Sequence, residues 1–406
     1  MNYPEALAWI YGLQRFGIKL GLENIQRLIA ALHVDLGCAR VIHVAGTNGK
    51  GSVCAMIDSI LRAQKHRTGL FTSPHLVTFR ERIRVNGEMI SDDAVANGLT
   101  AIRDLVRDWD PHPTFFEIAA ALALKHFSEA KIDIAILETG LGGRLDATNA
   151  VQSDVSVITP IAFDHQQWLG QSLEEIANEK AGIIKPRIPV VAAAQAPDAG
   201  KVIRHRAAEC QASLQFVHDS YHKSPLGLSG EHQKHNAALA IAALRAARID
   251  IDDSAIARGL ASVDLPARFQ RWDARTIIDG AHNPASARVL AQTWQATFDN
   301  QRATLILAVL SDKDLPGICE ALAPIAAYVF LPKIRSDRAT PPDDLAKALS
   351  ENVPSLPCSI TDSIADALAL ARAKANPILL TGSLHFAGEA LAYLRGESTA
   401  FEECAQ

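Results

Sequence analysis

Lys50 lies in a glycine-rich segment whose neighbours are suited to binding a nucleotide phosphate. The preceding run, RVIHVA, reads as a buried strand that ends at Ala45, and the residues after Ser52 read as a helix. Glycines between a strand and a helix let backbone N–H groups turn toward a phosphate, and the helix N-terminus adds its dipole. Lys50 would supply charge for the terminal phosphates, and Ser52 would support Mg²⁺. The candidate nucleotide-binding residues are Thr47, Asn48, Gly49, Lys50, Gly51 and Ser52.

This segment departs from the usual phosphate-loop pattern in two places. Val44 occupies the position of the first glycine, and Gly51 separates Lys50 from Ser52. A plain glycine-rich turn is the simpler interpretation, but the coincidence of strand, loop, lysine and helix favours phosphate binding. The helix also has one apolar face for packing on a sheet, formed by Val53, Met56, Ile57, Ile60 and Leu61.

Three further polar side chains stand at or just beyond the ends of expected strands. Ser73 follows the run GLF, Glu138 ends the strand IDIAIL, and His165 follows the run VSVITPIAF. Open α/β sheets bind ligands at this edge, and oxygen ligands with an occasional imidazole suit Mg²⁺. Taken singly, Ser73 is explained as a turn cap, Glu138 as a surface charge and His165 as a loop histidine. Their common position downstream of a phosphate loop predicts metal ligands.

The hydrophobic pattern supplies a sheet that would bring these strand ends together. Nearly continuous apolar runs are typical of parallel strands covered on both faces, and here they alternate with helical patterns. That order predicts a doubly wound α/β domain. Strands are expected at Arg40–Ala45, Lys131–Leu137, Asp154–Ile161 and Pro189–Ala193, and helices at Asp92–Trp109, Phe115–Ser128 and Leu173–Ala181.

A second, smaller α/β unit is expected after Leu265-Pro266-Ala267, where the alternation restarts. The expected domains are therefore residues 1–268 and 269–406. In the second unit, strands are expected at Thr276–Ile278, Thr304–Leu310, Ala327–Leu331 and Pro377–Thr381, and helices at Pro284–Thr297, Asp343–Leu349 and Ser363–Lys374.

Bulk composition excludes several classes of protein. The net charge of −5 offers no basic field for nucleic acid or for an anionic membrane. No apolar stretch is long enough to span a bilayer, and the N-terminus does not resemble a signal peptide. The six cysteines show no C-x-x-C pair and no zinc-type spacing, as expected of reduced thiols. We therefore expect a cytoplasmic protein, and a monomer.

Eight motifs, in order along the chain, resemble those of the folylpolyglutamate synthases, which belong to the Mur ligase superfamily. They are GTNGKGS, TSPHLVTFRERIRVNG, ETGLGGRLDATN, FDHQQWLG, EKAGIIK, PARFQ, DGAHNP and TGSLH, and the resemblance runs from about residue 2 to about residue 395. It implies an N-terminal P-loop ATPase domain, a smaller C-terminal Rossmann-like domain and an active site between them. It also implies an enzyme that uses ATP and Mg²⁺ to join L-glutamate to a folate-type carboxylate through an acyl phosphate.

The resemblance also assigns roles to single residues. Ser73, Glu138 and His165 would be ligands of Mg²⁺, with two ions expected and a monovalent cation as a further candidate. Composition alone explains Lys180 and Lys185 as ordinary solvated lysines, but the family pattern makes Lys180 a carbamylated lysine. Lys50, Glu138, His165 and Lys180 would then form the catalytic centre. Contacts to ATP are implied for Asn236, Arg268 and Asp279, and proximity to the incoming glutamate for His282 and Ser383.

Members of this family that also make dihydrofolate bind dihydropteroate through three segments. In this chain they correspond to Lys19–Leu22, Thr114–Glu117 and Leu145–Ala147. Lys19 stands where an acidic residue is expected, so a monofunctional synthase acting on reduced folates remains an alternative. Core packing is the other explanation for Phe115 and Phe116. The residues implied are Leu20, Gly21, Leu22, Thr114, Phe115, Phe116, Glu117, Leu145, Asp146 and Ala147.

Three rival functions remain open on the sequence. A UDP-muramyl amino-acid ligase usually devotes an N-terminal domain to the UDP group, whereas only 45 residues precede Gly46 here. A P-loop regulatory switch would not need the second α/β unit or the metal ligands. An inactive binding protein would lack some of the charged positions that the motifs require.

Overall fold

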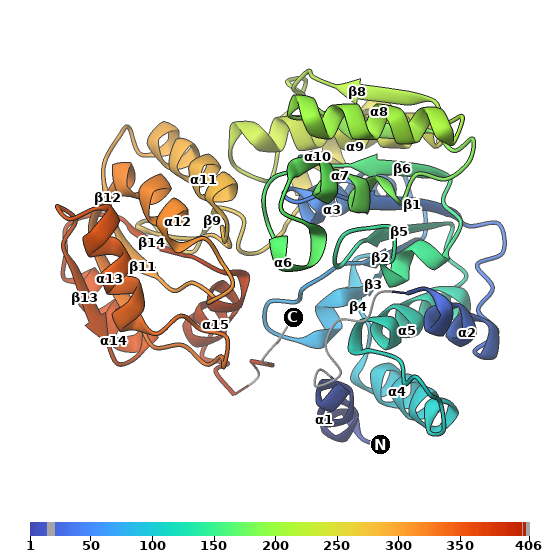
Figure 1. Cartoon of the computed structure of the whole chain (residues 1–406), viewed down its shortest axis with the longest axis horizontal. Helices are drawn as coiled ribbons and strands as arrows, with labels where there is room; N and C mark the ends of the chain where they lie inside the picture. Colours follow the sequence, from blue (N-terminus) through green and yellow to red (C-terminus); the bar gives the residue numbers. More distant parts are fainter. Residues whose placement is uncertain (14–20, 400, 403–406) are drawn as a thin grey trace.

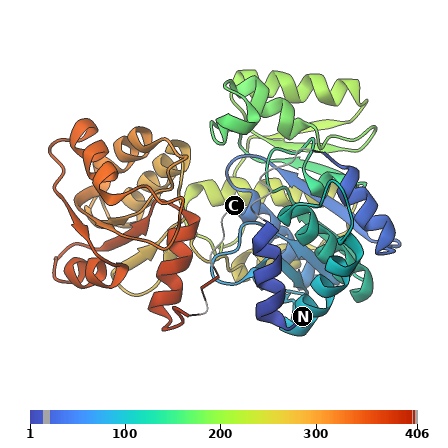
Figure 2. The same cartoon turned by 60° about the horizontal axis from the view of Figure 1, so that its bottom comes forward.

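The computed structural model describes residues 1–13, 21–399 and 401–402, and it forms two lobes that lie side by side (Figures 1 and 2). The larger lobe contains an eight-stranded sheet in the order β4-β3-β2-β5-β1-β6-β7-β8. The smaller lobe contains a six-stranded sheet in the order β13-β12-β11-β14-β10-β9. The expected pair of α/β units is confirmed.

In the larger lobe the strands are parallel except at one edge, where β3 and β4 form an antiparallel hairpin. The strands are β1 (Arg40–Ala45), β2 (Thr68–Phe71), β3 (Ile83–Val85), β4 (Glu88–Met89), β5 (Ile134–Glu138), β6 (Val155–Ile158), β7 (Val190–Ala193) and β8 (Leu214–Val217). The helices are α1 (Tyr3–Gly12), α2 (Glu23–Ala31), α3 (Lys50–Ala63), α4 (Asp92–Val106), α5 (Phe115–Ala130), α6 (Gln166–Leu169), α7 (Leu173–Ala181), α8 (Pro197–Glu209), α9 (Glu231–Ala246) and α10 (Asp253–Ser262).

Helices cover both faces of this sheet, as near-continuous apolar strands require. On one face α1, α2, α4 and α5 pack over β1, β2 and β5, while α7 and α8 pack over β6 and β7. On the other face α3, α9 and α10 form a second apolar layer. The five apolar residues predicted on one face of α3 are all buried in that layer.

The smaller lobe has the same layered construction, with one antiparallel strand, β9, at its edge. Its strands are β9 (Gln270–Arg271), β10 (Thr276–Ile278), β11 (Ala303–Leu307), β12 (Ala326–Pro332), β13 (Cys358–Thr361) and β14 (Ile378–Thr381). Its helices are α11 (Pro284–Thr297), α12 (Leu315–Leu322), α13 (Pro342–Asn352), α14 (Ile364–Arg372) and α15 (Leu384–Leu394). None of the helices in the described part of the chain combines the length and the apolar character needed to cross a membrane.

The structure differs from the sequence pattern mainly in its short strands. The sequence does not predict β3 or β4, because two or three residues are too few to show the alternation of apolar and polar side chains. It does not predict β8 because this edge strand is incompletely buried and so lacks a continuous apolar run. The strand expected to reach Ile161 ends at Ile158. The phosphate loop is also shorter than expected, because α3 begins at Lys50 and so includes Gly51 and Ser52 in its first turn.

Gly259 allows α10 to pack closely on α3, the helix that follows the phosphate loop. A Cβ atom at this position would lie 2.5 Å from the Cα of Ile60. We expect Gly259→Ala to lower the free energy of unfolding by about 2 kcal/mol, because backbone atoms cannot move aside cheaply. Thermal unfolding followed by circular dichroism measures this, with Gly12→Ala as the control, since a Cβ there meets nothing within 4 Å. Equal midpoints for the two variants would contradict the close-packing argument.

Candidate functional site

The glycine-rich loop lies at the carboxyl end of β1, and two of its glycines have conformations that other residues rarely adopt. Gly46 has φ of 147° and Gly49 has φ of 91°. A Cβ at Gly46 would lie 1.9 Å from Thr159 Oγ1, and one at Gly49 would lie 2.9 Å from Asn236 Oδ1. Both positions therefore require glycine for conformation and for space. The close approach of Gly49 also places the predicted ATP contact Asn236, on α9, against the loop.

The backbone of the loop is held by the neighbouring strand. The N–H groups of Thr47 and Asn48 both donate to Pro160 O, at 3.0 and 3.2 Å. The Thr47 side chain donates to Ala162 O and accepts from Ala162 N, each at 3.1 Å. The loop therefore keeps its shape through the segment that follows β6.

The side-chain nitrogens of two lysines lie against the same loop carbonyl. Lys50 Nζ donates to Gly46 O at 3.1 Å and to Thr47 O at 3.3 Å, and Lys180 Nζ donates to Gly46 O at 2.9 Å. Lys180, on α7, is buried, so the ordinary reading of a solvated lysine is wrong for this residue. Burial, followed by the charge of Lys50, lowers the pKa of Lys180 to about 7. Much of this amine is therefore neutral near pH 7.

Glu138 ends β5 with its carboxylate buried beside the loop. Its Oε2 atom accepts a hydrogen bond from Ser73 N at 3.2 Å. Burial raises the pKa of Glu138, whereas the charge of Lys50 and the Ser73 N–H favour the ionised form. The structure thus brings Glu138 and Ser73 into direct contact. A buried carboxylate is stable when a cation lies nearby, which fits a metal ligand.

His165 follows β6 and is the first residue before the short helix α6. Burial lowers the pKa of His165 to about 4, so the imidazole is neutral near pH 7, the form that binds a metal. Among the described residues no hydrogen bond or ion pair joins His165 to Ser73 or Glu138. The sheet order nevertheless places β2, β5, β1 and β6 side by side. Ser73, Glu138, the glycine-rich loop and His165 therefore follow four adjacent parallel strands at one edge of the sheet.

Ser73, Glu138 and His165 suit a metal ion that takes most of its ligands from phosphates and water rather than from the protein. The described residues contain no cluster of three or more His, Cys, Asp or Glu side chains placed to hold a metal ion alone. Mg²⁺ in nucleotide sites is typically held by one or two protein oxygens together with phosphates and water. One buried carboxylate, one serine and one neutral imidazole match that requirement. The residues present therefore fit Mg²⁺ bound together with a nucleotide.

Asp164 connects the two lobes beside this site, although the sequence, in which it stands next to His165 at a strand end, assigns it no role of its own. Its carboxylate accepts from Asn283 Nδ2 at 3.1 Å and from Lys313 Nζ at 2.7 Å. His282 Nε2 lies 3.5 Å from the same carboxylate. Asn283 also exchanges side-chain hydrogen bonds with Asn48 of the loop, at 3.1 and 3.3 Å. Asp164 stands next to the predicted ligand His165, and this position could have marked it as a site residue. Nothing in the sequence around Lys313 marks that residue in the same way.

A cleft of about 840 Å³ lies between the lobes and reaches the predicted site. Ser73 and Glu138 line it from the larger lobe, Leu384 lines it from α15, and Arg268 lines it from the connecting segment. Asp279, the other predicted ATP contact in this region, accepts from Phe269 N at 2.7 Å and from Ala281 N at 2.8 Å. Its carboxylate therefore already fixes the backbone that leads into the second lobe.

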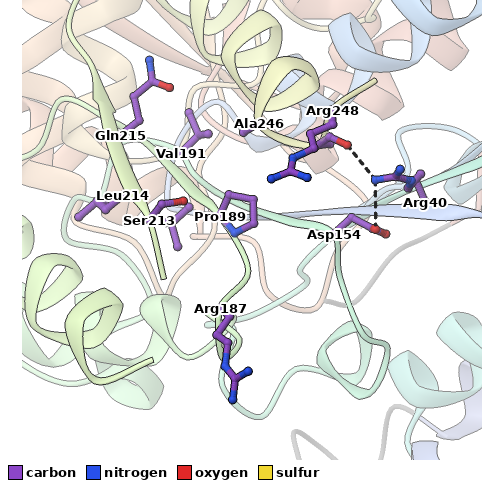
Figure 3. Close-up of a pocket in the computed structure, with 12 residues that line it drawn as sticks. Arg40, Asp154, Arg187, Pro189, Val191, Ser213, Leu214, Gln215, Ala246 and Arg248 are labelled. Carbon is purple, nitrogen blue, oxygen red and sulfur yellow. Dashed lines mark hydrogen bonds and ion pairs between the residues drawn. The ribbon is translucent and has the colours of Figure 1, made fainter. Parts of the chain in front are cut away.

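Another hollow, of about 560 Å³, lies at the amino ends of β1, β7 and β8, at the opposite edge of the sheet (Figure 3). Arg40 pairs there with Asp154, whereas Arg187 points away from both. This hollow contains none of the predicted site residues. Of these two hollows, the cleft between the lobes is the one that predicted site residues line.

The segment Thr114–Glu117 forms the start of α5, where two of its side chains are already engaged. The Thr114 hydroxyl accepts a hydrogen bond from Glu117 N at 3.3 Å. Glu117 Oε2 accepts two, from the N–H and from the hydroxyl of Thr114, each at 2.8 Å. Phe115 is buried and stacks on Tyr11 at 5.7 Å, as the core-packing explanation requires. Phe116 is only partly buried and its ring lies over Gly140. Of the four residues, Phe116 is the best placed to meet a ligand.

Of the other two predicted dihydropteroate segments, Leu145–Ala147 is fully described and Lys19–Leu22 only in part. Asp146 is buried and accepts from the N–H groups of Gly140 and Leu141 at 2.8 and 2.9 Å, so it orders the loop after β5. Leu145 is half-buried and Ala147 is buried. Lys19 and Leu20 lie outside the described residues, and the described part of that segment consists of Gly21 and Leu22, which precede α2.

The two residues expected near glutamate have local partners. Ser383 is buried and caps α15, since its Oγ accepts from Phe386 N at 3.0 Å. His282 Nδ1 lies 2.9 Å from Gly280 O and its other ring nitrogen faces Asp164. His282 is therefore at the interface between the lobes, whereas Ser383 has a structural role at the end of β14.

Comparison with known proteins gives matches along both lobes. Residues 44–189 match the Mur ligase middle domain, and residues 267–384 match the glutamate ligase domain of Mur ligases. The dihydrofolate synthase/folylpolyglutamate synthase of Bacillus subtilis is 36% identical, covering 95% of this chain and 97% of the relative. The enzyme of the same name from Escherichia coli is 36% identical over 93% of this chain and 92% of its own.

Solved structures agree with these sequence matches. Folylpolyglutamate synthase of Mycobacterium tuberculosis, complexed with ADP and AMPPCP, has a TM-score of 0.88 and 34% identity, covering 97% of this chain and 99% of its own. E. coli FolC, in complex with DHPP and ADP, also has a TM-score of 0.88 and 34% identity, covering 98% of each chain. A third structure, bound to Mn, AMPPNP and L-glutamate, has a TM-score of 0.84 at 31% identity and covers 97% of this chain and 98% of its own.

The low pKa of Lys180 predicts a pH-dependent cost of burying it. Between pH 7 and 10.5 the unfolded chain holds a proton on this amine that the folded protein has lost, so the stability falls as the pH falls through this window. We expect Lys180→Met to have a higher free energy of unfolding than the parent. The difference between variant and parent should be larger at pH 6.5 than at pH 10, by at least about 2 kcal/mol. Urea unfolding in CO₂-free buffer measures the difference. A gain that does not change with pH would show that Lys180 titrates normally.

Proposed function

The chain belongs to the dihydrofolate synthase/folylpolyglutamate synthase family of Mur ligases, and we propose that it uses ATP to join L-glutamate to dihydropteroate and to reduced folates. The observation that supports this proposal is that the glycine-rich loop, Ser73, Glu138 and His165 follow four adjacent parallel strands, with Ser73 N–H bonded to Glu138. Relatives of the same name, matched over nearly the whole chain, support the same reaction.

Residues of the loop would bind the phosphates of ATP. The positive φ of Gly46 and Gly49 turns the loop, and the N-terminus of α3 favours negative charge. Lys50 would leave its loop carbonyls to meet the terminal phosphates, a stronger partner for an ammonium group. Asn236, Arg268 and Asp279 border this region and would contact the rest of the nucleotide. Ser73, Glu138 and His165 would hold Mg²⁺, which when bound neutralises charge on the phosphates.

The reaction needs an activated carboxylate, because a carboxylate oxygen is a poor leaving group. The acceptor carboxylate would attack the terminal phosphate of ATP, releasing ADP and forming an acyl phosphate. The amine of glutamate would then attack the acyl carbon, lose a proton and release phosphate. The chain contributes position and charge, which dominate phosphoryl transfer. His282 lies at the lobe interface, where the incoming glutamate would approach.

Lys180 would serve as a carbamate. Only a neutral amine adds CO₂, and burial keeps much of Lys180 neutral near pH 7. Addition of CO₂ releases one proton and leaves a carboxylate where the Lys180 amine was, beside the loop. This carboxylate would offset the charge of Lys50 and help to order a metal site. Lys180→Ala should therefore lose activity that acetate partly restores.

Dihydropteroate would lie near Phe116 and the loop that Asp146 orders, with Leu22 and its neighbours as the third wall. Phe116 offers an aromatic ring at the edge of the core for stacking on a pteridine. Ser383 would instead lie near the incoming glutamate, as His282 would. A synthase acting only on reduced folates is the second candidate, favoured by Lys19 in a position expected to be acidic.

The same proposal covers the organisation of the molecule. Residues 1–268 would form the ATPase domain and residues 269–406 the C-terminal domain, since the two sheets are separate and α10 ends at Ser262. The active unit would be a monomer with small-molecule substrates and no nucleic-acid partner. The described cysteines are unpaired thiols, which fits the cytoplasm.

ADP release with and without glutamate tests this function directly. We expect glutamate-dependent ADP release with dihydropteroate and with tetrahydrofolate, because each carries a carboxylate that ATP can activate. Activity with tetrahydrofolate alone would select the monofunctional alternative. Activity with a UDP-muramyl substrate and neither folate would contradict the proposal.

Lys50→Ala tests the phosphate role of the loop. Turnover should fall by about two or more orders of magnitude, because a preorganised charge on the transferred phosphate is lost. Lys65→Ala is the control, since Lys65 follows α3 far from the loop and should keep full turnover. Both variants should show the parent's circular dichroism spectrum. Near-normal turnover in Lys50→Ala would refute the role.

A further inference from the structure

The loop that carries Ser73, residues 72–82 between β2 and β3, lies between the two lobes. Leu76 and Val77 pack into the apolar cluster that includes α15 of the smaller lobe. The contact is close, because a Cβ at Gly388 on α15 would lie 2.0 Å from Leu76 O. Any change in the position of this loop therefore affects both the lobe interface and Ser73.

A glutamate within the loop folds it from the inside. The carboxylate of Glu81 accepts from the N–H groups of Leu76, Val77 and Thr78 at 2.8, 2.9 and 3.1 Å. These bonds fix the turn between Leu76 and Thr78. They do not fix where the loop as a whole lies relative to the rest of the larger lobe.

A second glutamate, Glu402, holds the loop from the outside. Its carboxylate accepts from Thr78 Oγ1 at 3.2 Å, from the N–H of Phe79, and from the Tyr3 hydroxyl of α1 at 2.9 Å. Three donors on one partly buried carboxylate are a strong arrangement, because charged acceptors form the stronger hydrogen bonds. Glu402 therefore joins the loop to α1.

The backbone of Glu402 adds two further contacts with the loop. Its N–H donates to Val77 O at 2.9 Å, and its carbonyl oxygen lies 3.1 Å from His75 Nε2. Arg82 Nε donates to His75 Nδ1 at 2.8 Å, so the proton of this histidine is on Nε2 and points at Glu402. Both the side chain and the backbone of Glu402 thus contact residues 75–79.

The segment that contains Glu402 is also attached to the smaller lobe. The ring of Phe401 packs edge-on against His385 of α15, with centroids 5.2 Å apart. Arg335 Nη1 donates to Ser398 O at 3.1 Å. The segment after α15 therefore crosses from one lobe to the other and ends its described course on the Ser73 loop.

We infer that Glu402 is a positioning residue that fixes the Ser73 loop in place for metal binding and couples that loop to the smaller lobe. This inference rests on the proposed function, in which Ser73 is a metal ligand. Ser73 contacts Glu138 only through its own backbone N–H, so the position of its hydroxyl depends on the loop. Substitution of a residue that orients a metal ligand without binding the metal itself typically lowers metal affinity by about tenfold or more.

Mn²⁺ binding in the presence of AMPPNP, followed by the EPR signal of free Mn²⁺, tests the inference. The variants are Glu402→Gln, Tyr3→Phe and Ser73→Ala, with Glu397→Gln as a matched control on an exposed glutamate of the same segment. We expect Glu402→Gln to weaken Mn²⁺ binding about tenfold, Tyr3→Phe to weaken it less, and Glu397→Gln to leave it unchanged. AMPPNP affinity measured without a divalent metal should stay the same, because within the described residues the hydrogen bonds of Glu402 go to Tyr3 and to residues 75–79 rather than to the phosphate loop. Amides of residues 75–79 should exchange faster in Glu402→Gln.

The outcomes separate this inference from the proposed function. If Ser73→Ala weakens Mn²⁺ binding but Glu402→Gln does not, the positioning role is overturned and the metal role of Ser73 stands. If Ser73→Ala also binds Mn²⁺ like the parent, the metal assignment fails and the inference fails with it. Loss of metal-free AMPPNP binding in Glu402→Gln would show a general structural role and would likewise overturn the inference.

Discussion

The packing of two lysine side chains, the buried Lys180 and the partly buried Lys50, against one loop carbonyl is the constraint on which this site depends. Lys50 and Lys180 both donate to Gly46 O, and as like charges each destabilises the charged form of the other unless negative charge lies nearby. Glu138 supplies one buried carboxylate beside them. A nucleotide phosphate would add more negative charge, and a carbamate would replace the Lys180 amine with a carboxylate. The site is therefore organised for anions that arrive from solution.

The sheet explains why these charges meet where they do. Parallel strands place their carboxyl ends at one edge, so four segments far apart in the sequence contribute to one site. The second lobe closes that edge through Asp164, which receives hydrogen bonds from Asn283 and Lys313. Because Asn283 also pairs with Asn48 of the loop, the lobe interface and the phosphate site share residues. Binding of a ligand there would affect the fit between the lobes.

Much of this arrangement could be predicted from the sequence, because buried parallel strands and amphipathic helices leave strong patterns. The strand RVIHVA, the buried face of α3 and the positions of Ser73, Glu138 and His165 at strand ends follow from such patterns. The role of Lys313 could not, since it depends on a contact between residues 149 positions apart. Glu402 was missed for the same reason, because nothing local marks its contact with Phe79. Thr114 looked available for a ligand, yet it caps its own helix.

A crystal structure with Mn²⁺ and AMPPNP tests the central claim most directly, because anomalous scattering locates the metal independently of the phosphates. The account predicts the terminal phosphate beside Lys50, and Mn²⁺ bonded to Ser73, Glu138 or His165 at the carboxyl edge of the larger sheet. A nucleotide bound in this cleft with its terminal phosphate and metal away from all three residues would contradict it.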